Sequence, residues 1–332
     1  MTTRKDDLEP LDPKTAQEIY LDHKATNCTK STVQNHRYRT NHFIDWCAEE
    51  GIDNLNDLTG RDIQQFRLWR KGDGELNKLT LRMQMSTLRV FLKWAGTIEA
   101  VPQDLYNKVM VPRVRPAERR NNEMLQAEDA QEILQYLSKY EYASIEHVFL
   151  ALTWETGLRI GAVHSIDLED VNFDEKHIKL VHRPTEGTTL KNAKGGERLI
   201  AITPTLSELL TDHVDVQRHD VTDDYEREPL ITTTHGRMCR NSMRRLTYRI
   251  TSPCYRNEPC PDCKEIADEK CPEAVSPHAI RRGSITHFLS EDVPTEIVSD
   301  RMNVSRRILG EHYDKRSEEV KLEQRRSYLD NI

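Results

Sequence analysis

Four stretches in the first hundred residues place hydrophobic side chains at helical spacing, which limits this part of the chain to an all-helical fold. Asp12, followed by a proline, predicts the start of the first helix, and Ser31 predicts the start of the second. Thr59 opens the third, and the fourth spans 77–96. We therefore predict a helical domain over residues 1–111. The pattern leaves these basic side chains exposed: Arg37, Arg39, Arg67, Arg70, Lys71, Arg82 and Lys93.

Residues 112–123 interrupt the helical pattern with two prolines and four arginines. Proline disfavours helix both at its own position and at the residue before it. The dense positive charge indicates either a nearby anion or an ordinary charged tether between domains. We predict an interdomain linker over 112–123 and a second domain over 124–332.

The second domain combines helical patterns with one short β region. An alternating stretch over 171–182 and a second one over 198–203 predict strand, turn and strand, with Lys191 and Lys194 in the turn. The fold class is thus mainly α with a small antiparallel β-hairpin in the second domain. The helical patterns cover residues 127–140, 144–155, 204–219, 240–250, 278–290, 294–302 and 305–314.

Reactive side chains for phosphodiester chemistry occur along the second domain. Arg159 lies in Thr-Gly-Leu-Arg, and His278 and Arg281 lie three residues apart in Ser-Pro-His-Ala-Ile-Arg. Tyr313 follows in Leu-Gly-Glu-His-Tyr. Guanidinium groups bind phosphate through paired hydrogen bonds, and a phenol can attack phosphorus and hold it covalently.

The order of these motifs, with the lysine-containing turn between them, resembles the tyrosine recombinases, also called phage-type integrases, and most closely the haloarchaeal ones. The resemblance covers residues 12–332. It implies a two-domain DNA clamp made of a helical core-binding domain and a catalytic domain. It also implies double-stranded DNA as substrate, a dimer on each site and a tetramer in the synapse.

The resemblance implies a role for each reactive residue. Tyr313 would attack the scissile phosphorus to give a 3′-phosphotyrosyl bond, and Lys194 would protonate the leaving 5′ oxygen, with Lys191 as a rival acid. Arg159 and Arg281 would hold the non-bridging oxygens, and His278 would manage the phenol proton or orient the phosphate. This chemistry uses no catalytic cofactor.

Two positions depart from the family pattern. Asn303 occupies the place where a second His or a Trp is usual, and it can donate a hydrogen bond to phosphate but cannot transfer a proton. Ala162 stands where an acidic residue usually follows the first arginine. These departures leave two alternatives open, a catalytically decayed DNA-binding protein and a strand-swivelling enzyme of the type IB topoisomerase class.

Four cysteines, Cys254, Cys260, Cys263 and Cys271, form an insertion over 254–271 that the minimal family pattern lacks. Thiolates at this density suit a tetrahedral Zn²⁺ ion, around which a loop poor in apolar residues can fold. Clustered cysteines in a cytosolic protein favour metal binding over disulfides, and unligated thiols or a redox pair are the alternatives. We predict a structural zinc site without a catalytic role.

Composition bears on the cellular location of the protein. The 332 residues carry a formal net charge of −7, an unusual sign for a DNA-binding protein, although 48 basic residues are present and several are clustered. No apolar run is long enough to span a bilayer, and the N-terminus is charged, unlike a signal peptide. We expect a cytoplasmic protein that does not bind membranes.

Overall fold

The chain divides into two compact units, Met1–Asn121 and Asn122–Ile332. Each unit has its own hydrophobic core, and the main core clusters of the two units share no residue. The structure, a computed structural model, describes residues 8–72, 76–115, 123–260, 271–310 and 318–329.

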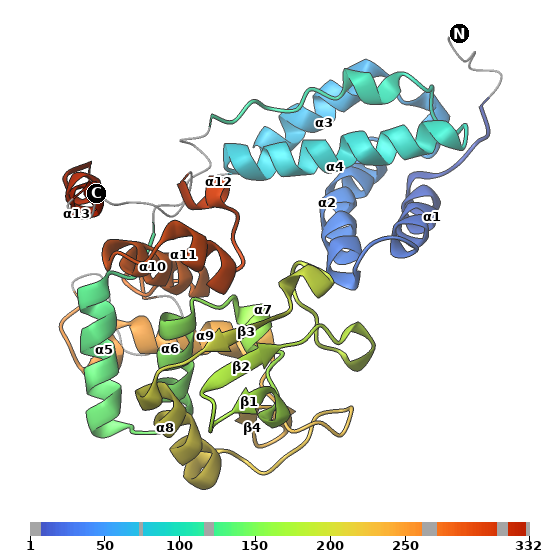
Figure 1. Cartoon of the computed structure of the whole chain (residues 1–332). Coiled ribbons are helices and arrows are strands. Elements are labelled where there is room, and N and C mark those ends of the chain that lie inside the picture. Colours follow the sequence, from blue (N-terminus) through green and yellow to red (C-terminus); the bar gives the residue numbers. More distant parts are fainter. Residues whose placement is uncertain (1–7, 73–75, 116–122, 261–270, 311–317, 330–332) are drawn as a thin grey trace. The chain divides into compact units, whose positions relative to one another are not determined.

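The first unit is helical throughout its described part, as predicted. Rings of Phe43 and Phe66 meet edge to face at its centre, with centroids 5.2 Å apart. Helix α2 packs against α1 and α4. The elements are α1 (Pro13–Ala25), α2 (Lys30–Glu49), η2 (Leu55–Asp57), α3 (Gly60–Gly72), α4 (Lys78–Thr97) and η3 (Leu105–Lys108) (Figure 1).

Side-chain caps fix where these helices begin. Asp12 Oδ1 accepts a hydrogen bond from Thr15 N at 2.9 Å, which satisfies a backbone donor of the first turn of α1. The predicted cap at Ser31 is wrong. Thr29 has the extended backbone of an N-cap, and its hydroxyl accepts from Thr32 N at 3.3 Å. Helix α2 therefore begins one residue earlier than the predicted cap.

The predicted exposure of Arg70 is also wrong. Its side chain is 4% exposed, and its Nε donates to Gln84 Oε1 at 3.0 Å. Position 70 lies on the same helical face as Ile63 and Phe66, both of which are buried, so the arginine points into the unit. A hydrogen-bonded partner on α4 makes this burial tolerable.

The second unit combines helices with a small sheet, one face of which is buried in the core of the unit. Short non-α elements separate them: η5 (Leu168–Asp170), η6 (Pro184–Glu186), η7 (Ala193–Gly196), the π-helix η8 (His213–Gln217) and η9 (Pro253–Arg256). The α-helices are α5 (Ala127–Tyr140), α6 (Ile145–Thr156), α7 (Ile160–Val163), α8 (Pro204–Asp212), α9 (Arg240–Thr251), α10 (Pro277–Ser290), α11 (Thr295–Arg301), α12 (Arg306–Ile308) and α13 (Glu318–Leu329) (Figure 1).

The main sheet has three antiparallel strands, β1 (Val171–Asn172), β2 (His177–Leu180) and β3 (Arg198–Ala201), in the order β1-β2-β3. A second hairpin pairs β4 (Thr232–Thr233) with β5 (Gly236–Arg237). The predicted single strand over 171–182 is therefore wrong. Asn172 Oδ1 accepts from Glu175 N at 2.8 Å and closes a turn that splits it in two.

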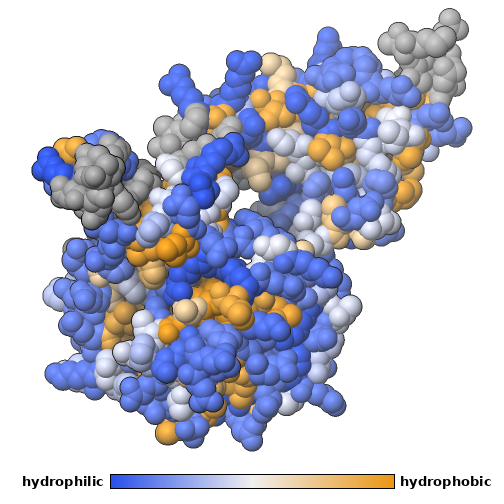
Figure 2. Space-filling model, viewed as in Figure 1, coloured by the Kyte–Doolittle hydropathy of each residue, from blue (hydrophilic) through white to orange (hydrophobic). Residues whose placement is uncertain are grey.

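The buried helix α6 organises the second core. Most of its residues are buried, and it packs against α5, α8, α9 and α10. A helix that is apolar on most sides lies in the interior rather than at the surface. Hydrophilic residues cover most of the face seen in Figure 2, where apolar residues form small groups. Among the described helices, none is long and apolar enough to cross a membrane.

Residues 123–125, the entry strap, run along α10 as the chain enters the second unit. Leu125 N donates to Ala279 O at 3.2 Å, and Arg282 Nη1 donates to Glu123 O at 3.0 Å. The strap lies so close that a Cβ atom at Gly283 would be 2.0 Å from Leu125 O. Only glycine fits at this position, because any side chain would collide with the strap backbone.

A buried ion cluster holds the β4–β5 hairpin against η5. Asp167 is 1% exposed and accepts from Arg227 Nη1 at 3.1 Å and from Arg237. Arg183 Nη1 lies 3.4 Å from the same carboxylate. Guanidinium groups around a buried carboxylate offset its desolvation, so these residues stabilise the fold as a group.

Candidate active site

Helix α10 presents His278 and Arg281 from its first two turns. The Ser276 hydroxyl caps the helix by accepting from Ala279 N at 3.4 Å, and Pro277 occupies the first helical position. Arg281 is 1% exposed, donates from Nη2 to Met302 O at 2.6 Å, and also donates to Gly157 O. These bonds fix the direction of its guanidinium.

Arg159 comes from the turn between α6 and α7. Gly157 ends α6 in the left-handed conformation with φ of 59°, and its N–H donates to Thr153 O at 3.0 Å. Two residues later, Arg159 caps α7, and its Nη1 donates to Asn303 O at 3.2 Å. A Cβ atom at position 157 would lie 2.7 Å from Met302 Sδ, so the same glycine admits Met302 beneath the site.

Residues 301–303, the carbonyl turn, join three arginines from separate parts of the chain. Arg198 Nε at the start of β3 donates to Arg301 O at 2.8 Å. Arg281 and Arg159 donate to the next two carbonyls, those of residues 302 and 303. Desolvation, followed by the charge of Arg159, lowers the pKa of Arg198 to about 10. One short segment of backbone therefore orients both arginines that the sequence singled out.

Residues 191–196, the lysine turn, lie in the last part of the connection from β2 to β3. Lys191 and Lys194 are both exposed. The turn contacts Asn303, whose Oδ1 accepts from Asn192 Nδ2 at 2.9 Å and whose Nδ2 donates to Gly195 O at 3.1 Å. Asn303 itself has a φ of 46°, a left-handed conformation that asparagine tolerates better than most residues.

The electrostatic environment of His278 favours its neutral form. Partial desolvation is the first cause, and the charges of Arg282, Arg281, Arg159 and Lys191 follow in that order. Together they lower the pKa of His278 to about 4. His278 is exposed to solvent. The contribution of the neighbouring cations to the lowered pKa can be tested by substituting them. The imidazole is therefore neutral at neutral pH in the DNA-free protein.

The structure brings Arg159, Arg281 and Asn303 together through hydrogen bonds at the carbonyl turn. His278 lies close enough to both arginines for their charges to lower its pKa. Lys194 lies in the lysine turn, which Asn303 contacts. Tyr313 lies outside the described residues. Ala162 is in α7, three residues after Arg159. Sequence reasoning missed Arg198, because it was read only as the start of a strand, and Arg282, which follows Arg281 directly.

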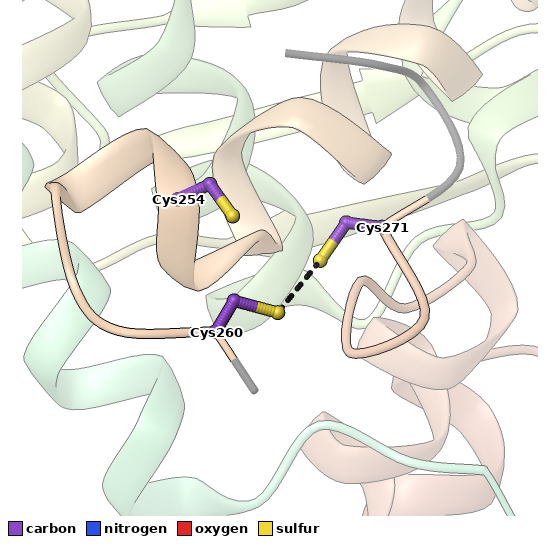
Figure 3. A group of neighbouring side chains, drawn as sticks. All are labelled: Cys254, Cys260 and Cys271. Carbon is purple, nitrogen blue, oxygen red and sulfur yellow. Dashed lines mark hydrogen bonds between the residues drawn. The ribbon is translucent and has the colours of Figure 1, made fainter. Parts of the chain in front are cut away.

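Three of the four predicted metal ligands lie together in a second cluster. The Sγ atoms of Cys254, Cys260 and Cys271 are all within 4.8 Å of one another (Figure 3). Those of Cys260 and Cys271 are 3.7 Å apart. A disulfide would require about 2 Å. Cys263 lies outside the described residues. The separation matches two ligands of one tetrahedral metal ion, because Zn–S bonds of about 2.3 Å place sulfurs about 3.8 Å apart.

Guanidinium groups fixed around a neutral imidazole, beside an exposed lysine turn, define a site suited to a phosphodiester anion. The chain belongs to the phage integrase family, whose model matches residues 123–317. A second model, the N-terminal SAM-like domain of phage integrases, matches residues 20–97. The predicted family is therefore confirmed.

Individual proteins are similar to this chain over different shares of its length. A tyrosine recombinase of Pseudothermotoga lettingae is 20% identical over 78% of each chain. The lambda integrase tetramer bound to a Holliday junction shares the fold at 13% identity, with a TM-score of 0.62 over 90% of this chain and 75% of that one. The N-terminal domain of a phage integrase/site-specific recombinase from Haloarcula marismortui is 33% identical, with a TM-score of 0.31 over 31% of this chain and 99% of that one.

Proposed function

We propose that the protein is a tyrosine-type site-specific recombinase that cuts and rejoins double-stranded DNA through a 3′-phosphotyrosyl intermediate. The observation that carries the proposal is the anchoring of Arg159 and Arg281 to adjacent carbonyls of the carbonyl turn. Guanidinium groups held in advance need little reorganisation when charge develops on a phosphate in the transition state. Membership of the phage integrase family supports the same function.

The proposed reaction balances through the residues of this chain. The Tyr313 oxygen forms a bond to phosphorus, the bond from phosphorus to the 5′ oxygen breaks, and neutral His278 takes the phenol proton. A lysine ammonium donates a proton to the leaving 5′ oxygen. Arg159 and Arg281 bind the non-bridging oxygens through their guanidinium groups. Rejoining runs the same steps in reverse.

We propose Lys194 as the acid, with Lys191 retained as the rival. Lys194 fits the family spacing before β3. Lys191 is among the cations that depress the pKa of His278, which supports its proximity to that imidazole. Separate substitution of the two lysines distinguishes them, because only loss of the acid slows departure of the 5′ oxygen.

The proposal assigns a task to each part of the chain. We propose residues 1–111 as the core-binding domain, 112–123 as the linker and 124–332 as the catalytic domain. Two protomers would occupy one DNA site and four would form the synapse, by analogy with the lambda integrase tetramer bound to a Holliday junction. We infer a cytoplasmic location because such an enzyme acts where its DNA substrate lies.

We also propose that the cysteine cluster holds one structural Zn²⁺ ion. The spacing of the Cys254, Cys260 and Cys271 sulfurs supports it, and we propose Cys263 as the fourth ligand. Four thiolates would fill the tetrahedral positions and leave no open position for substrate, so the ion would stabilise the loop before α10 rather than take part in the reaction.

A nicked DNA substrate, from which cleavage releases a short fragment that carries the free 5′ hydroxyl, tests the function. We expect the wild-type protein to form a covalent adduct and Tyr313→Phe to form none, while its DNA affinity stays within a few-fold. Removal of one hydroxyl deletes the nucleophile but leaves the cations that bind phosphate. An adduct on Tyr313→Phe would show that the nucleophile is another residue.

Cleavage of a four-way junction then separates recombinase from topoisomerase chemistry. A recombinase converts the junction to duplex products, whereas a type IB enzyme relaxes supercoiled DNA without resolving junctions. Absence of any adduct with the wild-type protein would favour a decayed DNA-binding protein instead.

A further inference from the structure

The side chain of Asn303 faces the lysine turn at both ends of its amide. Its Oδ1 accepts from Asn192 Nδ2 at 2.9 Å, and its Nδ2 donates to Gly195 O at 3.1 Å. Gly196 also lies close, because a Cβ atom there would be 3.5 Å from Asn303 Nδ2. The amide is thus engaged by protein groups on the turn that carries Lys191 and Lys194.

The backbone of the same residue faces the arginines. Asn303 O accepts from Arg159, and the preceding carbonyl, that of Met302, accepts from Arg281. Met302 is fully buried, and Asn303 N donates to Asp300 O at 3.1 Å. Both contacts hold the carbonyl turn in place. One residue therefore connects the guanidinium pair, through its backbone, to the lysine turn, through its side chain.

We propose that Asn303 is a positioning residue that holds the lysine turn in register with the two arginines, so that the acid meets the leaving 5′ oxygen of the phosphate that the arginines bind. This inference rests on the proposed function. It assigns the amide to the lysine turn, in place of the phosphate contact expected from the sequence. The exposed lysines have long flexible stems, and the backbone that carries them needs such an anchor.

Loss of the Asn303 amide should impair protonation of the leaving 5′ oxygen and leave phosphate binding by the arginines intact. Without the amide, the arginines keep their carbonyl partners, but the acid reaches the 5′ oxygen less often. The P–O5′ bond then breaks slowly, because an alkoxide leaves poorly without a proton. A substrate with sulfur in place of the bridging 5′ oxygen removes this need, since a thiolate is a far weaker base and leaves unprotonated.

The experiment compares single-turnover adduct formation on the ordinary substrate and on the 5′-bridging phosphorothiolate substrate. Asn303→Gly is the main variant, because glycine keeps the left-handed backbone and removes only the amide. We expect its rate on the ordinary substrate to fall on the order of a hundredfold, as for an ångström-scale misplacement of a catalytic group. On the sulfur substrate we expect a rate within a few-fold of wild type.

Other variants isolate each contact. Asn192→Ala breaks one of the two bonds, so it should show the same pattern with a smaller defect. Asn303→Asp keeps the acceptor but loses the donor to Gly195 O. Alanine at the lysine that serves as acid should be rescued by sulfur as Asn303→Gly is, whereas Arg159→Ala should stay slow on both substrates. Asn172→Ala, in a turn of the sheet away from these contacts, should match wild type on both.

Equal slowing of Asn303→Gly on both substrates would overturn the inference, because the amide would then act on the phosphate or on the arginines. A wild-type rate on the ordinary substrate would overturn it as well. If the wild-type protein itself forms no adduct on either substrate, the proposed function fails, and the inference fails with it. These results are distinct, because only the last one concerns the wild-type protein.

Discussion

His278 sits in a field of positive charge that comes from three segments: α10, the turn before α7 and the lysine turn. We expect its imidazole to titrate near pH 4 in the DNA-free protein, measured by NMR of the ring protons. The unfolded chain binds this proton near pH 6.5. Between these values only the unfolded state is protonated, so the contribution of His278 to stability falls as pH drops from about 6.5 to 4 and is constant above.

Lys191→Ala should raise the pKa of His278, because it removes one of the cations that oppose protonation. Lys179→Ala is the matched control, since Lys179 is also an exposed lysine, lies on β2 and is not among the main causes of this shift. Titration of His278 near pH 6.5 in the wild-type protein would contradict the description of this site.

At the scale of elements, the cysteine cluster connects directly to the helix that carries the site. Ala274 N donates to Cys271 O at 3.1 Å, Val275 N donates to Thr251 Oγ1 at 3.0 Å, and Ser276 then caps α10. We expect elemental analysis to find about one zinc per chain. Cys263→Ser and Cys254→Ser should lower zinc content, melting temperature and cleavage together, because metal binding and local folding are coupled.

Cys28→Ser provides the control, because Cys28 lies in the other unit and is half-buried. It should change none of the three quantities. Protein purified under reducing conditions without chelator and found to lack zinc would exclude the metal site. Full cleavage by protein verified as free of zinc would exclude its structural role while leaving the site itself intact.

At the scale of the whole molecule, two separate cores predict two unfolding transitions. Phe43→Ala removes a fully buried ring from the first core, and Phe149→Ala removes one from the second. Each should cost about 3–5 kcal/mol of unfolding free energy and lower only the transition of its own unit in calorimetry. A single transition lowered equally by both substitutions would show that the units unfold together.

Patterns within one element were predictable from the sequence, and contacts between distant elements were not. Helix α5 and the capped starts of α1 and α4 follow from periodicity and local side-chain caps. The carbonyl turn escaped prediction because its partners are main-chain oxygens, which carry no signature in the sequence. The ion cluster around Asp167 escaped for a related reason, since its arginines lie as far as 70 residues away along the chain.

Motif order located Arg159, His278 and Arg281, but it could not show what holds them. Arg198 has the same chemistry as the two predicted arginines, and its hydrogen bond to Arg301 O spans 103 residues. The contacts of the Asn303 side chain were out of reach for a similar reason. From sequence the residue is a substitute for a missing histidine, and only the fold reveals Asn192 and Gly195 against its amide.

The entry strap makes the position before Glu123 a place where the chain could change during evolution without disturbing the second unit. The strap is bound to α10 by its own hydrogen bonds, so insertions or deletions in the chain before Glu123 need not disturb the second unit. Gly283 allows this close contact, because a side chain at that position would push the strap away from α10. A related protein could therefore carry a different N-terminal unit before Glu123 and keep the second unit unchanged.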